Sequence, residues 1–250
     1  LGDIYEMNFC QTFYADNVRI APLEVFHKLN QIAESPFAAY CQFDQHYILS
    51  ASPERYMKKT GNQLISQPIK GTAKRLSNSE LDQEIALKLQ NDPKERAENI
   101  MITDLVRNDM AKTAQKGSVS VDELCGLYSF KTVHQLISSI SSKLKEETSI
   151  DAILQTTFPM GSMTGAPKLS AMEIIEKYEH NKRGIYSGAI GYITPEGDFD
   201  FNVVIRSILY NADLKRLSLQ VGSAITYQSS PQQEYEECLL KAEALLKALK

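Results

Sequence analysis

The sequence has few of the residues that build small metal or disulfide modules, with four cysteines and four histidines among 250 residues. The cysteines lie far apart, at positions 10, 41, 125 and 238, and form no C-x-x-C pair, which argues against a zinc module. The chain also lacks an apolar run of the ~20 residues that span a bilayer, and residues 1–25 lack the basic and apolar parts of a secretion signal. We therefore expect free thiols, no membrane partner and a cytoplasmic location.

Basic residues are not in excess either. The formal net charge is −4, so we expect no nucleic-acid partner, because counterion release needs a concentrated basic face. A small anionic ligand stays open, because local charge decides its binding. The 43% hydrophobic and 23% charged residues are typical of a globular protein. We expect one domain over residues 1–250, and a strand pattern that already begins at residue 4 leaves open an N-terminus upstream of Leu1.

The apolar pattern predicts an α+β fold. Apolar residues at helical spacing predict a helix over residues 21–34. Strand patterns bounded by turn residues occur at residues 4–14, 37–44, 46–53, 188–194, 199–210 and 217–227. The last three strands form an antiparallel pattern with helices before and after it, which disfavours a doubly wound nucleotide-binding fold.

Two predicted helix starts carry pairs of acids. One helix starts at the D-P-K-E motif of residues 92–95 and runs to about residue 108, and the other starts at the S-P-Q-Q motif of residues 230–233. The acids are Glu95 and Glu98 on the first helix, and Glu234 and Glu237 on the second, where Lys241 continues the same stripe. Two interpretations stay open: solvated acids favoured by the helix dipole, or a Mg²⁺ site where the two helix starts meet.

A glycine-rich motif, G-S-M-T-G-A-P-K, occupies residues 161–168. It is not a Walker loop, because three residues separate the glycines and a proline precedes the lysine. It is either a tight turn before a helix or an anion-binding turn that uses Ser162 and backbone N–H groups.

Three further polar residues lie within uncharged or apolar stretches of the sequence. Lys70 lies in P-I-K-G-T (residues 68–72); it is either a surface lysine or, if held out of water with a lowered pKa, a nucleophile. Arg206 lies in an apolar run and needs an anion, which is either a structural acid or a substrate carboxylate. His134 interrupts the strand pattern of residues 133–140 and is either a core histidine or a catalyst.

Together these stretches resemble the chorismate-utilising enzymes over essentially all 250 residues. The most specific matches are D-P-K-E-R-A-E-N (residues 92–99), D-L-V-R-N-D (residues 104–109), the glycine-rich motif of residues 161–168 and E-Y-E-E (residues 234–237). The resemblance implies a single domain of two large antiparallel sheets packed on each other, with helices outside. It also implies that Mg²⁺ is the cofactor and chorismate the substrate.

The resemblance further implies a role for each candidate residue. Mg²⁺ is expected on Glu98 and Glu237, supported by Glu95 and Glu234. The expected substrate contacts are Gly71, Thr72, Ser162, Tyr192, Arg206, Gly222 and Lys241. Glu54 is expected to protonate the departing C4 hydroxyl, with His134 in the same pocket. Ammonia is expected from a separate glutamine amidotransferase subunit, because no cysteine of the chain lies in a G-x-C-x-G elbow.

Lys70 discriminates between branches of the family. The P-I-K-G-T motif resembles the aminodeoxychorismate synthases, in which the lysine is thought to attack C2 of chorismate, whereas the anthranilate synthases typically have alanine there. Glu6 departs from the family, since its ammonia users usually have glutamine at that position and its water users lysine. Its carboxylate is expected to hold ammonia or ammonium. The alternatives are an anthranilate synthase, an isochorismate synthase and a paralogue that binds chorismate without turning it over.

Overall fold

Two antiparallel sheets face each other across the centre of the protein. The structure, a computed structural model, describes residues 2–250. The first sheet has the strand order β2-β3-β12-β13-β1-β9. Its strands are β1 (Glu6–Ala15), β2 (Phe37–Phe43), β3 (His46–Ser52), β9 (Gly165–Ala166), β12 (Ser207–Asn211) and β13 (Arg216–Thr226). The predicted α+β class with antiparallel sheets is confirmed.

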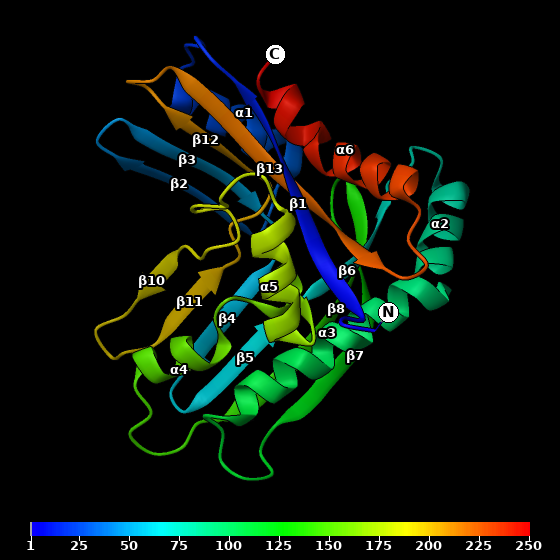
Figure 1. Ribbon diagram of the computed structural model, residues 1–250, viewed down its shortest axis with the longest axis vertical. Helices are drawn as coiled ribbons and strands as arrows, with labels where there is room; N and C mark the ends of the chain where they lie inside the picture. Colours follow the sequence, from blue (N-terminus) through cyan, green and yellow to red (C-terminus); the bar gives the residue numbers. More distant parts are fainter. Residues whose placement is uncertain (1) are drawn as a thin grey trace.

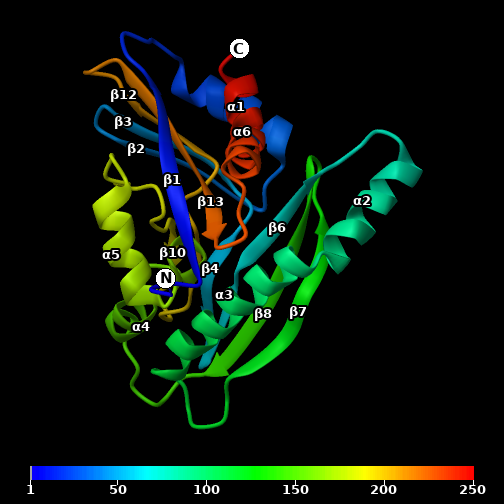
Figure 2. The ribbon, with the colours of Figure 1, turned by 45° about the vertical axis from the view of Figure 1, so that its right-hand side comes forward.

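The second sheet has the order β10-β11-β4-β5-β8-β6, with β7 also pairing with β8. Its strands are β4 (Arg55–Thr60), β5 (Gln63–Gln67), β6 (Ile69–Lys74), β7 (Ser120–Ser129), β8 (Val133–Lys143), β10 (Gly191–Ile193) and β11 (Phe199–Asn202). In Figures 1 and 2 this sheet lies below the first one, and the chain enters and leaves it several times.

Helices cover the outer faces of both sheets. On the first sheet, α1 (Pro22–Ala33) packs against α6 (Pro231–Ala248), and α6 packs on β13. On the second sheet, α3 (Pro93–Ala111) contacts β6, β7 and β8, and α2 (Ser79–Asn91) precedes it. The remaining helices are α4 (Ile150–Thr157), the short η1 (Gly161–Met163) and α5 (Lys168–Tyr178). No helix among residues 2–250 is long and apolar enough to cross a membrane.

The start of α3 is as predicted. The Asp92 carboxylate accepts hydrogen bonds from the backbone N–H groups of Lys94 and Glu95, at 2.9 and 3.1 Å, and Pro93 is the first helical residue. At the start of α6, Ser230 takes the N-cap position, but its side chain makes no cap hydrogen bond. Local sequence therefore fixes where both helices begin, and with that the places of their acid pairs.

The strand expected over residues 199–210 is two strands in different sheets. β11 ends at Asn202 in the second sheet, and β12 begins at Ser207 in the first. Between them Arg206 adopts a left-handed backbone with φ of 50°, which a continuous strand cannot contain. The apolar run is continuous because both strands are packed in the core, and this hid the break from sequence periodicity. The crossing places Arg206 between the two sheets.

Candidate active site

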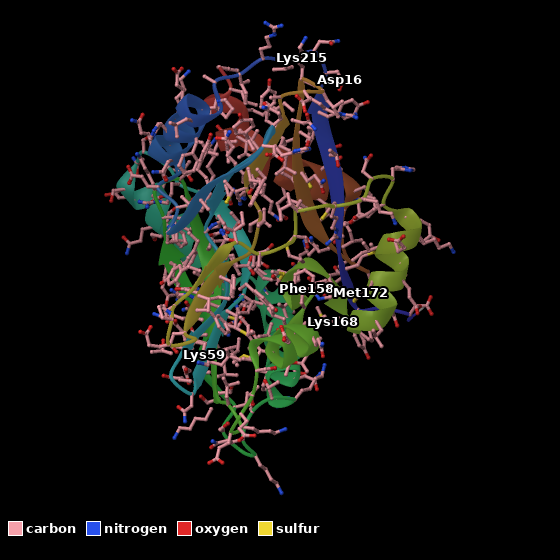
Figure 3. All side chains as sticks on the ribbon, turned by 90° about the vertical axis from the view of Figure 1, so that its left-hand side faces the viewer. Asp16, Lys59, Phe158, Lys168, Met172 and Lys215 are labelled. Atoms are coloured by element: carbon pink, nitrogen blue, oxygen red, sulfur yellow. The ribbon has the colours of Figure 1, made fainter. Side chains whose placement is uncertain are left out.

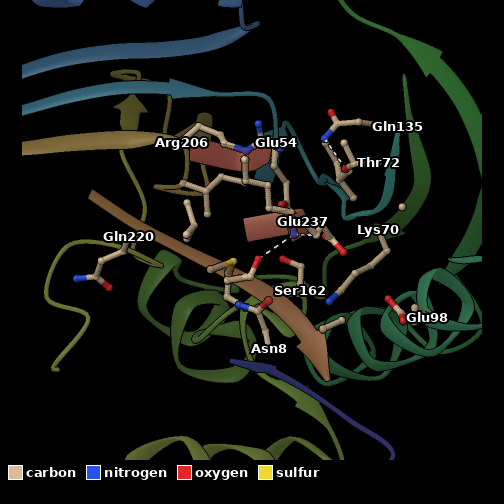
Figure 4. Close-up of a pocket in the computed structure, with 18 of the residues that line it drawn as sticks. Asn8, Glu54, Lys70, Thr72, Glu98, Gln135, Ser162, Arg206, Gln220 and Glu237 are labelled. Atoms are coloured by element: carbon tan, nitrogen blue, oxygen red, sulfur yellow. Dashed lines mark hydrogen bonds and ion pairs between the residues drawn. The ribbon is translucent and has the colours of Figure 1, made fainter. Parts of the chain in front are cut away.

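A cavity lies between the two sheets, at the place where Arg206 crosses from one to the other, and has about 670 Å³ of atom-free space that includes its opening to solvent. Figure 4 shows its polar side chains converging from both sheets and from two helices. Of the expected site residues, it is lined by Glu54, Lys70, Gly71, Thr72, Glu95, Glu98, Ser162, Arg206, Gly222, Glu237 and Lys241. Residues almost 190 positions apart in the sequence therefore meet in one place.

Lys70 projects from β6 into this cavity and is 9% exposed. Its Nζ lies 2.6 Å from Oε1 of Glu6, a fully buried residue at the start of β1. Asn99 of α3 donates a hydrogen bond to the Lys70 carbonyl at 3.3 Å and another to the Leu136 carbonyl at 3.0 Å. The helix thus holds the backbone of β6 beneath the lysine.

The pKa of Lys70 differs from the sequence-based expectation of a lowered value. Burial lowers it, but the negative charges of Glu6 and Glu98 outweigh burial, and the net pKa is raised. In the protein without ligands the lysine is therefore a charged partner of Glu6. It can act as a nucleophile once its proton has moved to that carboxylate.

The first acid pair, Glu95 and Glu98 on α3, has few partners that offset the burial of its charges. Burial, together with the charges of Glu6 and Glu95, raises the pKa of Glu98 to about 7, against the attraction of Lys70. Its Oε1 is buried and accepts no hydrogen bond from the described part of the chain, although Nζ of Lys94 lies 3.6 Å away. Burial and the charge of Glu237 also raise the pKa of Glu95. Buried carboxylates that repel one another are suited to a cation.

The two acids of the second pair, Glu234 and Glu237 on α6, lie in different places. Glu237 lines the cavity; burial would raise its pKa, but Lys241, 2.5 Å away, and the hydroxyl of Ser223 lower it on balance. Glu234 is not on the cavity wall. It accepts hydrogen bonds from Ser223 and from Nζ of Lys94, the latter at 2.9 Å. Glu234 therefore lies behind the site and ties α6 to α3.

The described residues, 2–250, contain no group of three or more acid, histidine or cysteine side chains placed to hold a metal by themselves. The carboxylates that line the cavity nevertheless fit Mg²⁺, because Glu98 has an unpartnered buried oxygen and Mg²⁺ takes one or two carboxylates plus water and substrate oxygens. Glu98, Glu95 and Glu237 are the residues that would hold the ion.

The other end of the cavity carries positive charge. Arg206 lines it and forms no ion pair within residues 2–250, which removes the structural ion pair left open for it above. Lys241, whose charge is paired with Glu237, donates a hydrogen bond to the Gly222 carbonyl at 2.8 Å. A Cβ at Gly222 would lie 2.7 Å from Sγ of Cys10, so the close pairing of β1 with β13 requires glycine there. This end is suited to a carboxylate.

Glu54 and Ser162 lie on a third side. Burial raises the pKa of Glu54 to about 7, and a hydrogen bond from the Ser162 hydroxyl only partly opposes this. About half of such a group is protonated at neutral pH, which suits a general acid. Gly71 and Thr72 of β6 also line the cavity. The φ of Gly71 is 88°, and a Cβ there would lie 3.1 Å from Oε2 of Glu95.

Tyr192 does not reach the cavity. It lies on the edge strand β10 and is 64% exposed, whereas Tyr186, which precedes that strand, is buried and lines the cavity. Two tyrosines flank the same glycine-containing stretch, and the sequence gives no reason to prefer one. The structure therefore places Tyr186, and not the expected Tyr192, on the cavity wall.

His134 also faces away from the cavity. Its Nε2 lies 3.0 Å from Oδ1 of Asp82 on α2, and its Nδ1 lies 2.8 Å from the Ser129 hydroxyl on β7. Because side chains alternate along β8, it is the next residue, Gln135, that lines the cavity. The core interpretation of His134 is correct, and its assignment to the substrate pocket is corrected to Gln135.

The sequence-based reasoning missed four polar or aromatic residues on the cavity wall. They are Asn8, Gln135, Tyr186 and Gln220. Strand alternation from Glu6 and Gly222, both recognised as site residues, would have found Asn8 and Gln220, since each is two residues away on the same face of its strand.

The cavity wall thus combines carboxylates, the unpaired Arg206 and the buried Lys70, which suits a small anion. The chain matches the chorismate binding enzyme family over residues 1–247. It therefore belongs to that family.

Its relatives include two functional branches of the family. The chain is 39% identical over 248 residues to aminodeoxychorismate synthase component 1 of Escherichia coli (strain K12), covering 99% of this chain and 54% of the relative. It is 37% identical over 228 residues to anthranilate synthase component 1 of Saccharolobus solfataricus, covering 91% of this chain and 54% of the relative. The chain thus spans about half the length of these curated relatives.

A solved structure agrees with the fold. Anthranilate synthase component I from Streptococcus pneumoniae superimposes with a TM-score of 0.87 at 32% identity, covering 98% of this chain and 53% of that one. The expected architecture of two packed antiparallel sheets with outer helices is confirmed.

Proposed function

We propose that this chain is an aminodeoxychorismate synthase that replaces the C4 hydroxyl of chorismate by ammonia. The product, 4-amino-4-deoxychorismate, would serve para-aminobenzoate and folate synthesis. The observation that carries the proposal is Lys70, which projects from the P-I-K-G-T strand into the cavity beside Glu6. Pure binding has no use for a buried nucleophile, which disfavours a paralogue that binds chorismate without turning it over.

The first half-reaction uses Lys70, Glu6 and Glu54. The Lys70 proton moves to Glu6, 2.6 Å away, and the neutral amine forms a bond to C2 of the ring. Both ring double bonds shift by one position, away from C2 and toward C4, as the bond between C4 and oxygen breaks. The departing hydroxyl takes the Glu54 proton and leaves as water.

The second half-reaction reverses the shift. Ammonia adds at C4 while the bond between C2 and the lysine nitrogen breaks, so that Lys70 leaves as a neutral amine. Glu54, now a carboxylate, takes the extra proton of the new ammonium group. Glu6 then returns its proton to Lys70, so that Glu6, Lys70 and Glu54 are back in their starting states. The sum is chorismate plus ammonia giving aminodeoxychorismate plus water.

The charged ends of the cavity would orient the substrate. Arg206, with Lys241 and Tyr186 nearby, would hold one carboxylate of chorismate. Mg²⁺ on Glu98, Glu95 and Glu237 would supply positive charge for the other. We further propose that a glutamine amidotransferase subunit delivers ammonia; support comes from the relative named component 1, a name that implies a second component.

The test is product analysis. The purified chain is incubated with chorismate, Mg²⁺ and an ammonium salt, and the products are separated and identified by mass. Aminodeoxychorismate is expected, and glutamine in place of ammonium should give none. Anthranilate as the main product would favour the alternative branch, whose members are 37% and 35% identical to this chain.

A further inference from the structure

The strand β6 is irregular at the proposed nucleophile. Its pairing with β8 shifts between Ile69 and Thr72. The two residues in this interval, Lys70 and Gly71, face a single residue of β8, Leu136. Two residues opposite one form a β-bulge, which bends a strand and changes the direction of a side chain. A bulge removes hydrogen bonds from the ladder, so the buried carbonyl groups beside it need other donors.

A second bulge lies on the other side of β8. The pairing of β8 with β7 shifts where Leu124 and Cys125 face Ser138 alone. Cys125 has a φ of 54°, and Gly71 in the first bulge has a φ of 88°. Leu136 and Ser138, the residues that the two bulges face, are two positions apart on β8. This strand is therefore irregular on both sides at one level, where α3 packs on the sheet.

Asn99 of α3 bridges the two bulges with one carboxamide. It is buried, and its Nδ2 donates hydrogen bonds to the Lys70 carbonyl at 3.3 Å and to the Leu136 carbonyl at 3.0 Å. Its Oδ1 accepts a hydrogen bond from the Ser138 hydroxyl at 2.5 Å, and that hydroxyl accepts one from the Cys125 backbone N–H at 2.9 Å. The nitrogen and the oxygen of the carboxamide thus both have partners, which leaves it one orientation.

The first bulge carries Lys70, whose side chain enters the cavity. Its Nζ lies 2.6 Å from Oε1 of Glu6, whereas a lysine such as Lys215 lies at the edge of the molecule in Figure 3. Asn99 does not line the cavity, so any effect that it has on the reaction passes through the residues that it contacts. Of the residues that its carboxamide bonds to, Lys70 is the one on the cavity wall.

We propose that Asn99 is a positioning residue for Lys70: its carboxamide holds the bulge of β6 and so keeps the Lys70 amine beside Glu6 and within reach of the ring. The inference rests on the function proposed above, in which Lys70 attacks C2 of chorismate. A shift of a reacting atom by about 1 Å can slow a reaction roughly 100-fold. A slight relaxation of the bulge is therefore enough to slow the attack while chorismate still binds at Arg206 and the acid end.

The test compares Asn99→Ala with the control Thr103→Val. Thr103 is buried on the same helix, and its hydroxyl donates a hydrogen bond to the Asn99 carbonyl at 2.7 Å, but it does not line the cavity. Both substitutions remove a buried hydrogen-bonding group and should lower the melting temperature. Asn99→Ala should also lower kcat roughly 30- to 100-fold and slow formation of the Lys70 adduct equally, with KM for chorismate within about twofold. Thr103→Val should keep kcat within about twofold.

Two further measurements separate positioning of Lys70 from other effects. Because Glu98 adjoins Asn99 on α3, the Mg²⁺ concentration for half-maximal turnover is measured as well and should stay within about twofold. A changed Mg²⁺ dependence would place the effect at Glu98 and overturn the proposal. Ser138→Ala removes the hydroxyl that orients Oδ1 of Asn99 and should lower kcat roughly threefold to tenfold. This variant decides the matter if Asn99→Ala does not fold, and an unchanged kcat in it would then overturn the proposal.

A last readout needs no turnover. The protein is acetylated with acetic anhydride at mildly alkaline pH, and the peptide that contains Lys70 is followed by mass. An amine released from Glu6 should react at least about threefold faster in Asn99→Ala than in the wild type, and Thr103→Val should react at the wild-type rate. An unchanged kcat or an unchanged acetylation rate in a folded Asn99→Ala protein would overturn the proposal. If the wild type makes no aminodeoxychorismate from ammonium, the proposed function has failed instead, and acetylation still tests the position of Lys70, so the two failures are distinguishable.

Discussion

Two buried groups of charged side chains lie on opposite sides of the strands β6 and β8, and they differ in how well they are bonded. Around His134, every ring nitrogen and both oxygens of Asp82 have partners, including Arg75 at 2.7 Å and the Leu76 backbone N–H at 2.8 Å. In the cavity, Glu98 has a buried oxygen without a hydrogen bond to any of residues 2–250. Within the same range, Glu6 and Lys70 have only each other at ion-pair distance.

The two groups also shift their acids in opposite directions. The backbone N–H of Leu76, with His134 and Arg75, lowers the pKa of Asp82 despite burial. Burial raises the pKa of Glu54 and Glu98 to about 7. Buried charged side chains with a full set of hydrogen bonds stabilise the fold. Buried charged side chains that lack partners lower its stability and are typical of a site that binds a ligand. The difference separates a structural cluster from a functional one.

The strongest test of this comparison is Lys70→Ala. Removing the nucleophile should lower kcat at least roughly 10³-fold, while chorismate binding changes little, because Arg206 and the acid end remain. Intact-protein mass spectrometry with chorismate and no ammonia should show an adduct in the wild type and none in the variant. Lys70→Arg should not rescue turnover, since a guanidinium stays charged. Full activity in that variant would mean that positive charge alone is needed.

Glu98→Gln tests the acid end. Losing one of so few carboxylates should raise the Mg²⁺ concentration for half-maximal turnover roughly 10–100-fold. Asp104→Asn is the control, since this acid is on the same helix but its side chain is 68% exposed and pairs with Arg107. A normal Mg²⁺ dependence in Glu98→Gln would remove Glu98 from the metal site.

Glu54→Gln should have a pH signature in stability. Because the folded-state pKa is raised from 4.5 to about 7, the wild type is most stable below pH 4.5 with respect to this group and loses that contribution as pH rises through 7. The variant should therefore gain stability relative to wild type at pH 8, on the order of 2–3 kcal/mol, and little at pH 4.

Denaturant unfolding at the two pH values measures this difference, and Asp82→Asn serves as the comparison. The pKa of Asp82 is lowered, so its contribution is present above its ordinary value of 3.8 and is lost as pH falls. Asp82→Asn should destabilise the protein at pH 8 and less so at low pH. If both substitutions changed the free energy of unfolding at pH 8 in the same direction, the two groups of charged side chains would not differ as described.

The smallest effect on catalysis is expected at His134. His134→Ala leaves Asp82 and Ser129 without a partner and should lower the free energy of unfolding by roughly 1–3 kcal/mol. Turnover should stay within about twofold, measured well below the melting temperature of the variant. A large loss of kcat with unchanged stability would return His134 to the active site.

Much of the site was predictable because it depends on local signals. A proline in the first turn marks the start of both α3 and α6, and Asp92 also caps α3. The helix period then puts each acid pair on one face. Lys70 was a candidate from the short P-I-K-G-T motif, whereas Glu54 came only from the resemblance to the family. The helix starts and the lysine motif need only a few neighbouring residues.

Other parts were not predictable, because period-two patterns do not say which face of a strand meets a ligand. His134 and Gln135 are adjacent, and only the packing of α2 against β8 assigns the histidine to the core. The choice between Tyr186 and Tyr192 likewise depends on β10 being an edge strand.

The sequence by itself determined the α+β class and the two helix starts that carry acid pairs, because these follow from residue periodicity and from helix-start residues. It also showed that Lys70 lies in an otherwise uncharged stretch. Only the tertiary structure decided that the chain leaves one sheet after Asn202 and enters the other at Ser207, which brings Arg206 into the cavity. It also decided the charge state of Lys70: the sequence places Glu6 and Glu98 far from this lysine, and the electrostatic energy depends on distances in space.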